Sequence, residues 1–114
     1  MSKFDDAVAT YASSLKDAVK RSSFDMDVLT AVAKSLGPSI YLEDASRVSC
    51  ADQVEKDRVK DKFLIGKLGL TDGPELRAAV DEVCEAMGSS NRNKYRAVFY
   101  YLLVEKFGKQ GMYK

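Results

Sequence analysis

A run of polar and basic residues near the C-terminus is the part of the chain whose residue types could do chemistry. It comprises Asn91, Arg92, Asn93, Lys94, Tyr95 and Arg96. Cations beside the free backbone amides at the start of a predicted helix are the elements of a phosphate or carboxylate site. The tyrosine ring adds a surface on which a nucleic-acid base could stack. The segment is therefore our candidate for binding an anion or a partner.

Internal ion pairing is the competing interpretation of this basic segment. The preceding predicted helix carries Glu75, Asp81, Glu82 and Glu85. A short turn would bring these carboxylates near Arg92 and Arg96, and the cations would then be satisfied within the protein. The alternative is that the chain presents them to a protein partner with an acidic surface, since residues 89–114 carry six basic and one acidic side chain. Nucleic acid is less favoured, because the sequence pI of about 7.7 lies below that of typical nucleic-acid binders.

The sequence has few side chains suited to catalysis or to binding a metal or cofactor. There is no histidine, which removes the commonest general base and imidazole metal ligation. The two cysteines, Cys50 and Cys84, show neither metal-ligand spacing nor a disulfide framework. We predict that both are free thiols in a reducing compartment, acting as small apolar residues. The sequence therefore predicts a protein that is not an enzyme, with no catalytic residue, no metal and no cofactor.

Helical periodicity predicts the elements that must position the basic segment. Apolar residues repeat at three- and four-residue steps over about 5–21, 25–36, 52–68 and 75–87. Asp25 and Asp72 are the expected caps of the second and fourth segments, and Gly37-Pro38 is the expected stop of the second. Between the second and third segments, residues 39–48 are expected to form a connection with one short helical turn, held to the core by Ile40 and Leu42.

The last segment, 91–107, is expected to be the central helix. Ala97 to Val104 are apolar around the whole helix circumference, which is typical of a buried helix. The same residues could form a buried strand, but no second strand is available to pair with it. So long an apolar run could also mean that one face meets a second copy in a homodimer. The predicted fold is all-α: a small bundle of four long helices plus a short helical connection, with a buried C-terminal helix.

The domain organisation and compartment follow from length and hydropathy. The 114 residues fit one domain, 1–114, in which 109–114 are expected to form a loose tail. The longest apolar run has eight residues, whereas a bilayer-spanning helix needs about 20. Met1 to Ala12 lack the apolar core of a signal peptide. We therefore expect a cytoplasmic protein with no membrane contact.

Several stretches of the chain resemble a family of small bacterial proteins of unknown function. They are Gly37–Tyr41, Lys62–Ile65, Lys67–Leu70, Asn91–Val98 and Tyr100–Leu103. The resemblance covers most of the chain and implies a small helical domain, but it carries no activity and no functional residues. The sequence then favours a non-enzymatic protein-interaction or regulatory module. The alternative is binding of nucleic acid or a phosphate ligand through the basic start of the last helix.

Overall fold

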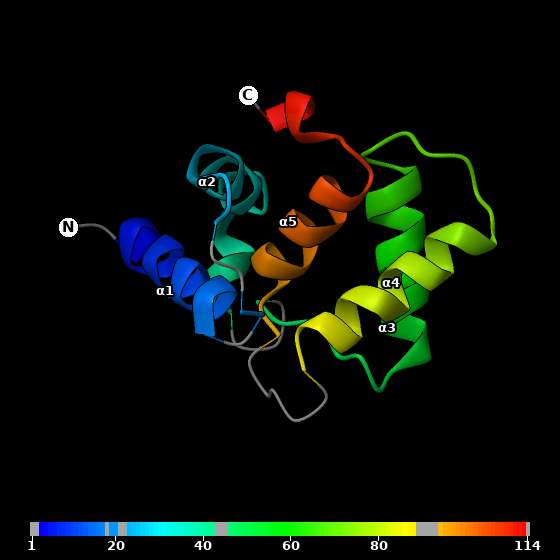
Figure 1. Ribbon diagram of the computed structural model, residues 1–114, viewed down its shortest axis with the longest axis horizontal. Coiled ribbons are helices and arrows are strands. Elements are labelled where there is room, and N and C mark those ends of the chain that lie inside the picture. The colour runs from blue at the N-terminus through cyan, green and yellow to red at the C-terminus, as the bar shows by residue number, and fades with distance from the viewer. Residues whose placement is uncertain (1–2, 18, 21–22, 43–45, 89–93, 114) are drawn as a thin grey trace.

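The computed structural model describes residues 3–17, 19–20, 23–42, 46–88 and 94–113 (Figure 1). Its α-helices are α1 (Lys3–Asp17), α2 (Met26–Ser35), α3 (Gln53–Arg58), α4 (Pro74–Ala86) and α5 (Arg96–Lys106). Two 3₁₀-helices, η1 (Gly37–Tyr41) and η3 (Gln110–Tyr113), and one π-helix, η2 (Val59–Ile65), complete the helical elements. The all-α prediction is confirmed, with five α-helices instead of four and no strand within the described ranges.

Helix α5 is the centre of the fold, as its composition predicts. It lies between α1 and α2 on one side and α3 and α4 on the other (Figure 1). All eight residues from Ala97 to Val104 are buried, because α2, α4 and α1 all pack against this helix. The alternative of a buried strand is therefore wrong.

Local capping chemistry sets several helix ends where the sequence predicts them. The Asp25 carboxylate accepts hydrogen bonds from the amides of Asp27 and Val28, at 3.0 and 3.2 Å, and begins α2. Gly37 then adopts a φ of 65°, the left-handed conformation that favours glycine after a helix. The short helical turn expected between residues 39 and 48 is η1, which begins slightly earlier, at Gly37.

Two expected anchors have different roles in the structure. Ile40 is buried as predicted, but Leu42 is 60% exposed and does not hold the connection to the core. Asp72 does not cap α4, because the cap residue is Gly73 and the Asp72 carboxylate lies 3.3 Å from Lys60 Nζ instead. A tertiary ion pair has replaced the local cap.

Helix α5 begins at Arg96, later than the predicted start near residue 91. Tyr95 is extended and forms an antiparallel bridge with Arg47. The amide of Val48 donates to the carbonyl of Lys94, and the amide of Arg96 donates to the carbonyl of Ser46. This pairing with a distant segment satisfies backbone groups that would otherwise belong to a first helical turn.

The prediction of two free thiols is wrong, because Cys50 and Cys84 form a disulfide with a Cα–Cα distance of 5.9 Å. Cys50 precedes α3 and Cys84 lies in the last turn of α4. The packing of α3 against α4 brings them together, and a separation of 34 residues gives no local sign of this.

The predicted third long helix is two elements joined end to end, α3 and the π-helix η2. The wide turn is visible in hydrogen bonds that span five residues, from the Gly66 amide to the Asp61 carbonyl and from Leu68 to Phe63. Such π-turns are rare and frequently occur at functional sites. Gly66 lies where the π-turn ends, and a Cβ there would be 2.7 Å from the Lys62 carbonyl oxygen.

Replacing this glycine should disturb the π-helix. Gly66→Ala is expected to lower the free energy of unfolding by about 1–3 kcal/mol, because the methyl group would overlap a backbone oxygen. Gly111→Ala is the matched control, since a Cβ at Gly111 meets nothing within 4 Å. Urea denaturation of the two variants measures the difference. A gain in stability from Gly66→Ala, as in an ordinary helix, would contradict the close approach.

Candidate functional site

The described end of the predicted basic segment, Lys94 to Arg96, is partly buried. Asn91, Arg92 and Asn93 lie outside the described residues. Lys94 and Tyr95 precede α5 as an extended stretch, and Arg96 is the first residue of the helix. The structure thus brings the last three residues of the segment against Ser46–Val48.

The Arg96 guanidinium lies in an internal polar cluster. It donates to Glu55 Oε1 at 2.7 Å, to the Tyr100 hydroxyl at 3.0 Å and to the Arg47 carbonyl at 3.2 Å. Its side chain is only 17% exposed. Burial opposes the charged form, but Tyr100 and Glu55 outweigh it and raise the pKa of Arg96. The carboxylate beside Arg96 is therefore Glu55 of α3, whereas the sequence predicted a carboxylate of α4.

Those α4 carboxylates have other neighbours. Asp81 pairs with Lys56 at 3.0 Å, and Glu82 pairs with Lys106 of α5. Both contacts tie α4 to an adjacent element.

Two tyrosines pack together beside the extended stretch, and a third, Tyr41, is close enough to influence one of them electrostatically. The rings of Tyr11 and Tyr95 are 5.3 Å apart between centroids. Burial, followed by the neighbouring Tyr95 and Tyr41, raises the pKa of Tyr11 to about 12. Tyr41 is 47% exposed, next to the exposed Leu42. We call Tyr41, Leu42, Lys94 and Tyr95 the Tyr41 surface.

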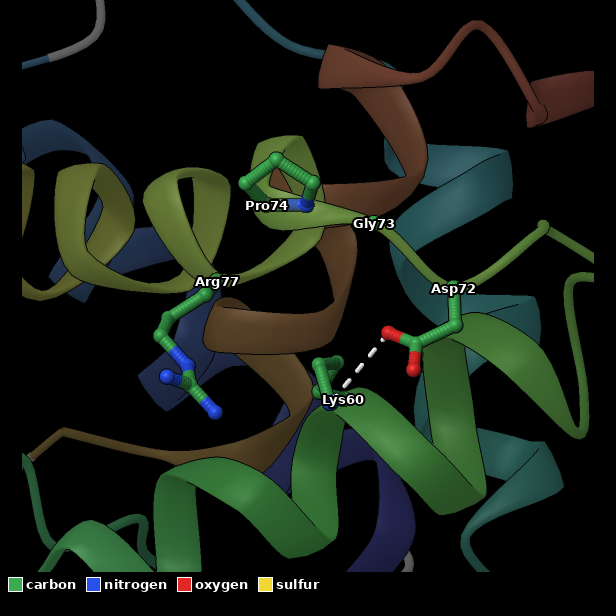
Figure 2. Close-up of a pocket in the computed structure, with 5 residues that line it drawn as sticks. All are labelled: Lys60, Asp72, Gly73, Pro74 and Arg77. Atoms are coloured by element: carbon green, nitrogen blue, oxygen red, sulfur yellow. Dashed lines mark hydrogen bonds and ion pairs between the residues drawn. The ribbon is translucent and has the colours of Figure 1, made fainter.

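A pocket of about 370 Å³ lies where α4 begins against η2 (Figure 2). Lys60 Nζ is 3.3 Å from Asp72 and 3.4 Å from Asp61, and the hydrogen bond to Asp72 is the main cause that raises the pKa of Lys60. Arg77 extends from α4 along the pocket wall and lies 3.7 Å from Asp57. Because both cations face carboxylates of this chain, the arrangement ties the start of α4 to the helix below it.

A smaller pocket of about 190 Å³ lies between α2, η2, α5 and η3. Its lining residues are Ser35, Leu36, Lys62, Phe63, Lys67, Tyr100 and Tyr113. The rings of Phe63 and Tyr100 stack at 3.8 Å and 14° on one wall. We call this cavity the Tyr113 pocket. Sequence reasoning missed it, because an α-helix would separate Lys62 and Lys67 by about 140° around its axis.

A comparison with protein families matches residues 10–111 to DUF2853, a family of proteins of unknown function. The chain belongs to this family. The resemblance to a family of unknown function is therefore confirmed, and the family brings no activity with it. No curated protein matches the sequence.

The described part of this DUF2853 chain offers neither a metal-binding cluster nor a membrane-spanning helix. No group of three or more acidic or cysteine side chains there could hold a metal ion. Within the same ranges, no helix combines the length and apolar character that crossing a bilayer requires.

Proposed function

We propose that the protein is a non-enzymatic interaction module that binds an acidic protein partner through the Tyr41 surface. The observation that carries the proposal is the exposure of two neighbouring large side chains, Tyr41 at 47% and Leu42 at 60%. Tyrosine is enriched among the residues that dominate protein interfaces. We further propose that the module works in a bacterial cytoplasm.

The exposed pair is held in place by its own backbone. The Leu42 amide donates to the Ser39 carbonyl at 3.1 Å, and the Leu42 carbonyl accepts from the Ser46 amide at 2.8 Å. Tyr41 also lies near the packed rings of Tyr11 and Tyr95. A backbone that is already ordered in this way loses little conformational freedom on binding, which favours affinity.

Charge supports an acidic partner. Residues 89–114 have a net charge of +5, from six basic and one acidic side chain. Lys94 of this stretch is joined through its carbonyl to the amide of Val48, two residues after Ser46, whose amide donates to the Leu42 carbonyl. A basic region attracts an acidic surface and speeds the encounter. Nucleic-acid binding through Asn91–Arg96 is the alternative, but Arg96 already donates to Glu55 and Tyr100.

The test places a photo-crosslinking amino acid at Tyr41 in the native cells. We expect one adduct of defined mass whose yield falls about ten-fold when Lys94→Glu is added, because the charge change repels an acidic partner. Met26, which is 44% exposed, is the matched control position and should give no such adduct. Equal products from positions 41 and 26, or none from either, would overturn the proposal.

Self-association is the other partner class that the experiment must separate. Sedimentation of the purified protein gives a mass near 12.6 kDa for a monomer and near twice that for a dimer. If the protein is a dimer and the crosslink at position 41 joins two copies, the partner of the Tyr41 surface is a second copy of the chain and not an acidic protein.

A further inference from the structure

We propose that the Tyr113 pocket is a binding site for a small phosphate monoester, held by Lys62, Lys67 and the Tyr113 hydroxyl. This site is separate from the Tyr41 surface and does not depend on the proposed interaction function. Four elements build it: the end of α2, the π-helix η2 with the turn after it, the middle of α5 and the 3₁₀-helix η3.

The π-helix is what places two lysines at one pocket. In an α-helix, residues five apart point about 140° away from each other. Two hydrogen bonds at the end of η2 connect residues five apart instead, from the Gly66 amide to the Asp61 carbonyl and from Leu68 to Phe63. This wide turn lies between Lys62, which is in η2, and Lys67, which follows it. Lys62 and Lys67 therefore both line the cavity.

These two lysines differ from Lys56, Lys60 and Lys106, which all form ion pairs within the chain. Among the described contacts, Lys62 and Lys67 make no ion pair and no side-chain hydrogen bond. Two positive charges at one cavity repel each other, and an anion between them would remove that repulsion.

Tyr113 supplies a third donor. Its hydroxyl oxygen is buried and has no hydrogen-bond partner of normal geometry within the described structure, although the Ser35 hydroxyl is close enough to lower its pKa. Burial is the larger influence and raises the pKa of Tyr113, so the phenol keeps its proton and can donate it to an anion. Ser35 already donates to the Val32 carbonyl at 2.7 Å. A buried polar group without a partner requires an explanation, and a ligand oxygen provides one.

The donors and walls define the ligand class. Two ammonium groups match the charge of a phosphate dianion, whose oxygens can also accept from the tyrosine. Leu36 and the stacked rings of Phe63 and Tyr100 add apolar surface for a small organic group. The volume of about 190 Å³ is below the roughly 300 Å³ at which pockets for drug-sized ligands begin. A phosphate ester of a small carbon group therefore fits better than a nucleotide.

The experiment titrates the purified protein with phenyl phosphate, inorganic phosphate, sulfate and sodium acetate in a calorimeter. We expect saturable binding of phenyl phosphate, weaker binding of inorganic phosphate and none of acetate. The double change Lys62→Ala with Lys67→Ala should weaken phenyl phosphate binding about ten-fold or more, because two charged donors are lost. Lys3→Ala with Lys16→Ala removes the same charge from exposed positions of α1 and should leave binding unchanged.

Tyr113→Phe provides a second variant that keeps the ring and its packing. It should weaken phenyl phosphate binding about five-fold without changing the helical circular dichroism signal. Inorganic phosphate that binds as tightly as phenyl phosphate would make free phosphate the ligand of this site. Absence of phosphate binding, equal binding of acetate, or equal losses in the pocket variants and the α1 control would overturn the proposal.

Discussion

Removing the Cys50–Cys84 disulfide is expected to lower the free energy of unfolding by about 3 to 4 kcal/mol. The bond joins residues 34 positions apart, and closing a loop of that length removes conformational entropy mainly from the unfolded chain. It also connects the turn before α3 to the last turn of α4, two elements that otherwise meet through ion pairs such as Lys56–Asp81. Exposed ion pairs contribute about 1 kcal/mol or less.

Urea denaturation with and without a reductant measures this loss. The Cys50→Ser, Cys84→Ser double variant should match the reduced protein and show no further response to the reductant. Both should unfold at a lower urea concentration than the oxidised protein. Equal midpoints for the oxidised protein and the double variant would show that the crosslink adds nothing to stability.

The disulfide also bears on where the protein works. Structural disulfides persist in oxidising compartments and are rare in a reducing cytoplasm. The predicted cytoplasmic location requires reduced thiols, whereas the disulfide requires an oxidising compartment. Alkylation of thiols in intact cells decides between the two. Cysteines that react before reduction indicate a reducing compartment, in which the chain must fold without the bond.

Features that depend on neighbouring residues could be predicted from the sequence. Asp25 begins α2 because its carboxylate reaches amides two and three residues along the chain. Gly37 ends the same helix because its φ of 65° suits glycine. The burial of α5 follows from apolar residues around its whole circumference, whatever packs against it.

Features that depend on packing between distant segments could not be predicted. Asp72 stands where the sequence pattern predicts a helix cap, but its carboxylate forms an ion pair with Lys60 of η2 instead. The bridge between Arg47 and Tyr95 delays the start of α5, and nothing near residue 95 indicates it. The π-turn likewise follows from hydrogen bonds that a helical pattern does not distinguish from those of an α-helix, so the Tyr113 pocket had no sequence signal.

Breaking the Glu55–Arg96 pair is the second change with a large expected effect. Both side chains are less than one-fifth exposed, at 14% and 17%. Glu55→Ala should lower the free energy of unfolding by about 3 kcal/mol, because it removes the Glu55 carboxylate from a largely buried guanidinium. Arg58→Ala is the control, since Arg58 contacts the same glutamate at 3.4 Å but is 55% exposed, and it should change stability by less than about 1 kcal/mol.

The double variant Glu55→Leu with Arg96→Met separates a structural role of Arg96 from a binding role. Replacing both partners by apolar side chains should recover most of the stability that Glu55→Ala loses, since no unpaired charge remains. A stable double variant that still gives the crosslink at Tyr41 assigns Arg96 to the fold. If Glu55→Ala leaves stability unchanged and the double variant loses the crosslink, the Arg96 guanidinium binds the partner and its contact with Glu55 does not stabilise the fold.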